Sequence, residues 1–171
     1  GGERAVSLRK QTARLERLIE ALLTLSRIDA GVLQLEKKEV DIFTLLELSA
    51  EGVDEIIRAR KIRVDIPNHP DITFQGDMEW SMEAFSNLIK NCAEHTPEGG
   101  RIIMDYTCNP LYTQIMLRDT GAGFAPEELP HVFERFYRGK DAGENGIGIG
   151  LSLAKSLIEM QNGFLTAQNL P

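Results

Sequence analysis

The chain has 171 residues, of which 42% are hydrophobic, so it is long enough for one globular domain with a core and an appended segment. Its formal net charge of −7 at pH 7 provides no basic field for a polyanion and argues against nucleic acid as a partner. No apolar run approaches the roughly 18 residues needed to cross a bilayer, and no signal peptide is evident, which favours a cytosolic domain.

The first predicted element is a long helix from Glu3 to about Asp29. Apolar residues recur seven positions apart in two series, which is heptad spacing: Leu8, Leu15, Leu22, and Leu18, Leu25. Further apolar residues widen this face and favour a bundle that needs additional helices: Ile19, Leu23, Ile28. The alternative is an amphipathic helix lying on its own domain, although nearly thirty residues would span about 40 Å.

The segment after this helix alternates between short elements and turns. Gly31 is expected to end the helix, and residues 32–40 are predicted to form a short extended linker in which a hinge could lie. Asp41 is expected to cap a second helix whose apolar face reaches Ile56. Strands are predicted at 61–66 and near 72–74, and His69 between them is interpreted as an exposed turn residue.

A helix capped by Asp77 is predicted to carry a polar face. Asn87 and Asn91 are four residues apart and share one face, while apolar neighbours bury the other. Asparagine is a poor helix former, so two of them on one face indicate a function, with chance polar placement as the alternative. Cys92 follows on this helix and, like Cys108, lacks metal-ligand spacing, so we expect both to be small buried residues in a reducing compartment.

Two glycine clusters follow a predicted hairpin of strands at 101–107 and 111–118. The first is Asp119-Thr120-Gly121-Ala122-Gly123, and the second, Gly146-Ile147-Gly148-Ile149-Gly150-Leu151, runs into an apolar helix whose N-terminal amides offer a phosphate site. Between them we expect a short aromatic helix over 133–139 and a polar lid over 140–145. Either cluster alone could be a turn, but the two with a lid between them indicate a nucleotide.

In this order, Asp-x-Gly-x-Gly, Phe-Glu-Arg-Phe-Tyr-Arg and Gly-x-Gly-x-Gly-Leu resemble the G1, F and G2 boxes of sensor histidine kinases. The asparagine helix is similar to their N box, and residues 14–31 resemble the second helix of their dimerisation bundle. Their ATP-binding domain belongs with those of Hsp90, gyrase and MutL. The resemblance implies an α+β fold, a two-layer α/β sandwich of the Bergerat type with helices on one face of a mixed sheet, preceded by a long N-terminal helix.

The resemblance also implies roles for individual residues. Asp119 would hydrogen-bond the adenine amino group, and Asn91 would ligate Mg²⁺ with support from Asn87, both of which supply amide oxygens that suit this ion. Lys90 would replace a cation that the family often has where this sequence has Glu94, and Arg138 would act with it on the phosphates. The remaining residues expected around ATP come from the three boxes and the lid: Gly121, Gly123, His95, Phe136, Tyr137, Lys140, Gly146, Gly148, Gly150, Leu151.

The predicted organisation is a bundle helix over 1–31, a linker over 32–40 and an ATP-binding catalytic domain over 41–171. In the family, the γ-phosphate passes to a histidine on the bundle and then to an aspartate of a response regulator. This chain has histidines only at His69, His95 and His131, so we expect a fragment that lacks the phosphoacceptor. The resemblance further implies a homodimeric parent in the cell membrane, with this part in the cytoplasm.

Two other functions compete with this interpretation. A hydrolytic ATPase of the wider family carries a water-activating glutamate where this sequence has Asn87, an amide that is not a base at neutral pH. A non-catalytic signalling module would keep the fold without nucleotide binding. The intact glycine boxes and Asn91 argue against that second alternative. A last strand is expected over residues 164–168, and the family usually adds one more strand after it, so an unpaired sheet edge is expected.

Overall fold

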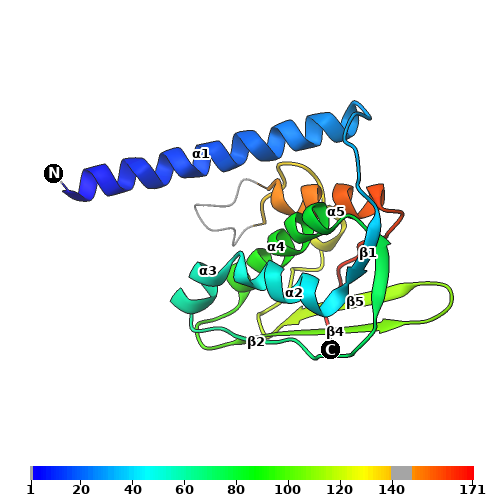
Figure 1. Cartoon of the computed structure of the whole chain (residues 1–171). Coiled ribbons are helices and arrows are strands. Elements are labelled where there is room, and N and C mark those ends of the chain that lie inside the picture. Colours follow the sequence, from blue (N-terminus) through cyan, green and yellow to red (C-terminus); the bar gives the residue numbers. More distant parts are fainter. Residues whose placement is uncertain (1, 140–147) are drawn as a thin grey trace.

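The computed structural model describes residues 2–139 and 148–171. It has two layers, in which helices cover one face of the strands, and a long N-terminal helix lies across the helical layer on the side away from the strands (Figure 1). The predicted α+β sandwich with a leading helix is therefore confirmed.

The long helix α1 spans Gly2–Asp29 and has two environments along its length. Its N-terminal half projects beyond the rest of the molecule (Figure 1), whereas Leu25 in its C-terminal half is only 2% exposed. The structure thus combines the two alternatives that the heptads left open. One part of the helix lies on its own domain, and the other part presents an apolar face to solvent.

The strands form two sheets. In the first, β1 (Lys38–Asp41) pairs antiparallel with β3 (Thr73–Gly76). In the second, β4 (Arg101–Cys108) lies between β2 (Arg63–Asp65), to which it is parallel, and β5 (Thr113–Asp119), to which it is antiparallel. Residues 38–40, predicted as linker, therefore lie in a strand at the edge of the domain, and the extended connection is confined to residues 32–37.

Two carboxylates cap helices as expected. Asp41 accepts the backbone N–H of Thr44 at the start of α2 (Ile42–Glu51), and Asp77 accepts that of Trp80 at the start of α4 (Met78–His95). The helix predicted to run on to Ile56 is instead interrupted, because α2 ends at Gly52 and α3 (Asp54–Ala59) begins after Val53. The last helix, α5, spans Gly150–Met160.

The main core lies between α2, α4 and the larger sheet. Residues of β4 alternate between buried and more exposed positions, which is the period of a strand with one face on a core. Ile102, Met104 and Tyr106 are at most 2% exposed and pack in one cluster with α2 and α4 residues such as Leu45 and Ile89. This packing fixes the end of β5 beside the C-terminal half of α4.

Three local predictions are wrong. Residues 133–139 do not form a helix: they follow a short 3₁₀ turn, η1 (Leu129–His131), as a series of turns, and Phe136 has a φ of 64°, which no right-handed helix contains. Residues 164–168 form no strand. Cys108 is exposed at the hairpin end, whereas Cys92 is largely buried. Within the described ranges, no helix is both long and apolar enough to cross a membrane.

Candidate nucleotide site

The first glycine turn begins where β5 ends. Asp119 Oδ1 accepts the Gly121 N–H at 2.8 Å, which closes the turn locally. A Cβ added to Gly121 would lie 2.3 Å from the carbonyl oxygen of His95 at the end of α4. A side chain cannot fit in this space, so glycine is required here for a close approach of two backbones. The contact brings Asp119 to the end of the helix that carries the two asparagines.

Cys92 lies beside Asp119 in this corner. Burial, and then the nearby carboxylate of Asp119, raise the pKa of the Cys92 thiol to about 12. The cysteine is therefore a neutral thiol at physiological pH. The sequence showed it only as a small residue on the buried side of the helix.

The two asparagines lie one turn apart on α4, and Asn87 lies next to the start of α5. A Cβ on Gly150, the first residue of α5, would come within 3.8 Å of Asn87 Oδ1, an ordinary contact distance. Asn91 lines a groove that also contains Asp119, Gly121, Gly123 and Leu151. Predicted residues from the N, G1 and G2 boxes are thus brought to one region, although their roles toward a ligand stay predictions.

The second glycine turn packs against the residues that precede the undescribed segment. Gly148 has a φ of 74°, and a Cβ there would lie 2.3 Å from the Tyr137 carbonyl oxygen. The Phe136 N–H donates to the Gly148 oxygen at 2.8 Å. In the part of the chain that the structure describes, no side chain caps α5, unlike α2 and α4, so its first amides suit an anionic group.

The aromatic residues of the F box are less enclosed. The Phe136 ring is 59% exposed, and Tyr137 lies with its ring centroid 5.4 Å from that of His131. Partial burial raises the pKa of Tyr137, and the glutamates around it, Glu128 first, add to the effect. His131 is the last residue of η1, and its Nδ1 lies 2.7 Å from Glu134 Oε1.

The structure describes two of the predicted cations, Lys90 and Arg138. Lys90 Nζ lies 4.0 Å from Glu94 Oε1, so the lysine expected to replace a missing cation instead faces the glutamate that occupies that position. His95 is exposed, and its ring lies 6.2 Å from that of Phe124. Arg138 is exposed, and Lys140 and Gly146 lie outside the described residues.

Asn169 is a contact that sequence reasoning missed. Its Oδ1 accepts the Phe124 N–H at 2.9 Å and its Nδ2 donates to the Phe124 oxygen at 2.6 Å. Gly123, with a φ of 77°, passes directly beneath this carboxamide. No sequence pattern could have indicated the pairing, because it joins a loop to a segment 45 residues later.

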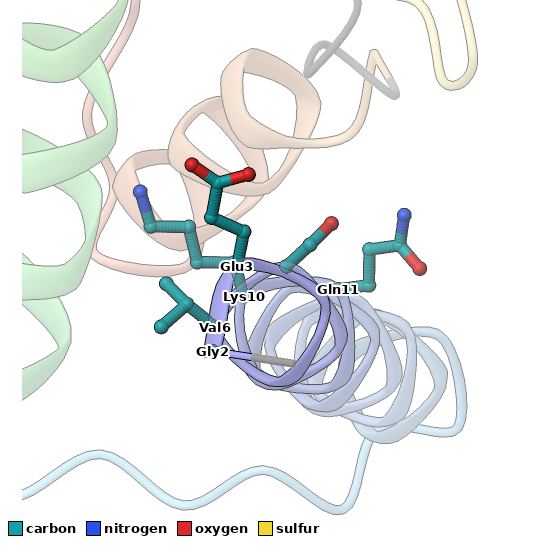
Figure 2. Close-up of a pocket in the computed structure, with 6 residues that line it drawn as sticks. Gly2, Glu3, Val6, Lys10 and Gln11 are labelled. Atoms are coloured by element: carbon teal, nitrogen blue, oxygen red, sulfur yellow. The ribbon is translucent and has the colours of Figure 1, made fainter.

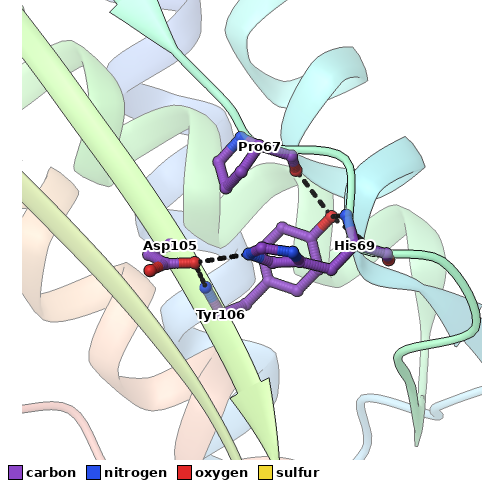
Figure 3. Close-up of polar contacts among 4 residues, drawn as sticks. All are labelled: Pro67, His69, Asp105 and Tyr106. Atoms are coloured by element: carbon purple, nitrogen blue, oxygen red, sulfur yellow. Dashed lines mark hydrogen bonds and ion pairs between the residues drawn. The ribbon is translucent and has the colours of Figure 1, made fainter.

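Two other surface features lie apart from this region. Figure 2 shows residues that line a pocket on the projecting end of α1, none of which was predicted as a site residue: Gly2, Glu3, Val6, Ser7, Lys10 and Gln11. Figure 3 shows His69, placed in a turn as predicted, with Nε2 2.9 Å from Asp105 Oδ1. Tyr106 accepts the His69 N–H and donates to the Pro67 oxygen, so this cluster fastens the turn to β4.

Comparison with known proteins identifies the family. A profile of the family described as "Histidine kinase-, DNA gyrase B-, and HSP90-like ATPase" matches residues 76–171, which contain both glycine turns and the asparagine helix. The chain belongs to this ATPase family. Signal transduction histidine-protein kinase BaeS of Escherichia coli K12 is 28% identical over 172 residues, covering 99% of this chain and 37% of BaeS. The chain thus spans little more than a third of this relative.

Solved structures of histidine kinases share the fold of this ATPase-family chain. The mycobacterial sensor histidine kinase MprB has a TM-score of 0.64 at 28% identity, covering 74% of this chain and 81% of that one. Full-length ShkA in complex with AMPPNP has a TM-score of 0.77 at 24% identity, covering 92% and 33%. ThkA in complex with the response regulator protein TrrA has a TM-score of 0.66 at 21% identity, covering 89% and 43%. The predicted resemblance to sensor histidine kinases is confirmed.

Proposed function

We propose that this chain is the ATP-binding catalytic part of a sensor histidine kinase. It would pass the γ-phosphate of ATP to a histidine on a dimerisation bundle, for relay to an aspartate of a response regulator. The observation that carries the proposal is the close approach of Gly121 to His95, because it brings Asp119 to the helix that carries Asn91, and both residues line one groove. The family to which the chain belongs supports the same activity.

The residues present suit ATP and Mg²⁺. Asp119 Oδ1 is engaged by Gly121, which leaves the other carboxylate oxygen to accept a hydrogen bond from an adenine amino group. Asn91 and Asn87 have side-chain amide oxygens, which are ligands that suit Mg²⁺. The first amides of α5, which no side chain caps, suit a phosphate. The metal would neutralise phosphate charge, and the chain's own contribution is to bind and orient the nucleotide.

The partners are proposed on the same basis. The relative ThkA was solved with a response regulator protein, and BaeS is named a signal transduction kinase, which supports a response regulator as the final acceptor. The exposed apolar face of α1 supports a homodimer formed through a helical bundle in the parent protein. A cytoplasmic position of this domain in a membrane-located parent is part of the same proposal.

The adenine assignment is tested by the Asp119→Asn variant. The substitution replaces an acceptor by a donor in a partly buried site, so the affinity for AMPPNP with Mg²⁺ should fall by about 1–3 kcal/mol. Isothermal calorimetry measures the loss, and Asp71→Asn is the matched control, because Asp71 is exposed and asparagine also tolerates its φ of 61°. Equal affinities of the Asp119 and Asp71 variants would remove Asp119 from adenine recognition.

A second experiment separates the kinase from a hydrolytic ATPase. Asn87 has no basic electron pair at neutral pH, so water should be activated poorly and ATP turnover should be slow. With γ-labelled ATP, the chain alone should remain unlabelled, whereas an added helical bundle carrying its histidine should acquire acid-labile label. Rapid release of labelled phosphate without transfer to the bundle would favour the hydrolytic ATPase instead.

A further inference from the structure

The last turn of α1 is joined to the F box by a two-pronged ion pair. Arg135 Nη1 lies 2.7 Å from Asp29 Oδ2, and Nη2 lies 2.8 Å from Oδ1, across 106 residues of sequence. This fork-to-fork geometry fixes the direction as well as the distance of the two side chains. The Arg135 guanidinium also holds the pKa of the Asp29 carboxyl below its usual range, so the pair is charged at neutral pH.

An apolar interface lies next to this ion pair. Leu25 of α1 forms one buried cluster with residues of α4 and α5 that are at most 4% exposed: Ala84, Ile149, Leu153, Ala154, Leu157. Leu18, Ala21, Ile28 and Trp80 pack around it. Burial of this cluster supplies the stabilisation of the docked helix, and the ion pair sits at its exposed rim.

On its other side, Arg135 is connected to the proposed phosphate end of the site. The next residue, Phe136, donates its N–H to Gly148, and Gly148 fits against the Tyr137 carbonyl with no room for a side chain. Two residues after Gly148, α5 begins next to Asn87. Arg135 is therefore held by α1 through its side chain and by the second glycine turn through the adjoining backbone.

We propose that Asp29 is a positioning residue through which docking of α1 and nucleotide binding at the second glycine turn strengthen each other. The inference rests on the proposed function and specifies how that site is regulated. When α1 is docked, Asp29 holds Arg135 and thereby the backbone that supports Gly148. Because coupling between two equilibria is reciprocal, a nucleotide that orders the Gly148 turn must stabilise the docked helix by the same factor.

A different result is expected if the Asp29–Arg135 ion pair does not couple helix docking to nucleotide binding. An exposed pair usually contributes little to stability, and its loss would loosen α1 to the same extent with or without nucleotide. The distinguishing quantity is thus the dependence of helix docking on nucleotide. Trp80, the single tryptophan of the sequence, packs against the α1 cluster and reports docking through its fluorescence.

The test uses three variants of the whole chain: Asp29→Arg, Arg135→Asp and the exchanged pair that carries both substitutions. A cation in the last turn of a helix is favourable, so Asp29→Arg should not weaken α1 itself. The control is Arg58→Asp, which reverses one charge of the exposed Asp54–Arg58 pair on α3, outside the α1 interface. AMPPNP affinity with Mg²⁺ is measured by calorimetry, and quenching of Trp80 by acrylamide is measured with and without AMPPNP.

Each single reversal should lower AMPPNP affinity about threefold or more and abolish the protection of Trp80 by AMPPNP, and the exchanged pair should recover both. Arg58→Asp should change neither. The proposal is overturned if the single reversals expose Trp80 but bind AMPPNP like wild type, or if the exchanged pair recovers nothing. Failure of the wild-type chain to bind AMPPNP would instead contradict the proposed function, and the coupling with it.

Discussion

Gly121 is required by a contact and not by an unusual φ. Replacing it with alanine should be destabilising, because the new Cβ would lie 2.3 Å from the His95 oxygen and the two backbones would have to separate. Overpacking of this kind costs about 1–3 kcal/mol, which lowers Tm by several degrees in a chain of this size. Calorimetric melting without nucleotide provides the measurement.

Gly150→Ala is the matched control for this prediction. Its new Cβ would have only ordinary 3.8 Å contacts with Asn87, at a helix position where alanine is favoured. Its Tm should therefore stay close to that of wild type. If the two alanine variants melted alike, the close approach of the first glycine turn to α4 would not exist in solution.

At the same scale, sequence reasoning was informative about residues whose chemistry is visible in a short motif. Asp119, Asn91 and the glycines were assigned to one site because their motifs resemble the boxes of sensor histidine kinases, and the structure brings Asp119, Asn91, Gly121 and Gly123 to one groove. Arg135 and Asn169 were missed, because their partners Asp29 and Phe124 are far away in sequence. Lys90 was proposed as a substitute for the cation missing at Glu94, and the structure adds that its ammonium group lies 4.0 Å from the Glu94 carboxylate.

Helix α2 offers a prediction about pH. The backbone N–H and then the hydroxyl of Thr44 bond to Asp41 and hold its pKa below the usual 3.8. A depressed folded-state pKa contributes stability that is present above 3.8 and is lost as pH falls through the lower folded-state value. Asp41→Ala should therefore cost about 0.5–2 kcal/mol at pH 7, and the deficit relative to wild type should shrink below pH 3.8.

The Asp41→Asn variant distinguishes the effect of the capping hydrogen bond from the effect of the carboxylate charge. Asp41→Asn retains an oxygen that can accept the Thr44 N–H, so its stability at pH 7 should lie near that of wild type. Without a titrating group at this position, its melting temperature should vary less with pH between about 5 and 2. Parallel pH series of thermal melts check both variants, and an identical pH dependence of wild type and Asp41→Asn would contradict the role of the charge.

Element boundaries were predicted best where a side chain marks them. Asp41 and Asp77 cap the helices that they were expected to cap. The break between α2 and α3 was missed because the apolar period continues through it to Ile56, although Gly52 stands at that point. The helix predicted over 133–139 is absent because Phe136 has a positive φ, and its N–H bonds to the distant Gly148 oxygen instead of to a helical neighbour.

For the whole molecule, the two heptad series of α1 lie in different environments. Leu18 and Leu25 pack against α4 and α5, whereas Leu8, Leu15 and Leu22 are 38–64% exposed. Leu15→Glu should therefore reduce self-association, which sedimentation velocity measures, without changing Trp80 fluorescence. Leu25→Ala should instead change Trp80 fluorescence without reducing self-association, because it removes about 2–5 kcal/mol of buried packing from the docked helix. If both changes affected both measurements equally, α1 would not have two separate faces.

The overall architecture was accessible from sequence because the ordered motifs resemble those of sensor histidine kinases, whereas hydrophobic period and caps indicated the individual elements. The way in which α1 rests on α4 and α5 was not, since heptad spacing describes an apolar face and says nothing of what covers it. The undecided choice between a bundle helix and a helix lying on its own domain reflects a real property of the sequence. It contains enough apolar residues for both.

The carboxamide of Asn169 closes a long loop by bonding to the backbone of Phe124. By holding both backbone groups of Phe124, it closes a loop of 45 residues that contains the F box, the second glycine turn and α5. Closing such a loop has an entropic cost that grows only slowly with its length, so two hydrogen bonds can maintain it. Both hydrogen bonds must therefore break before the segment after the first glycine turn can separate from Asn169.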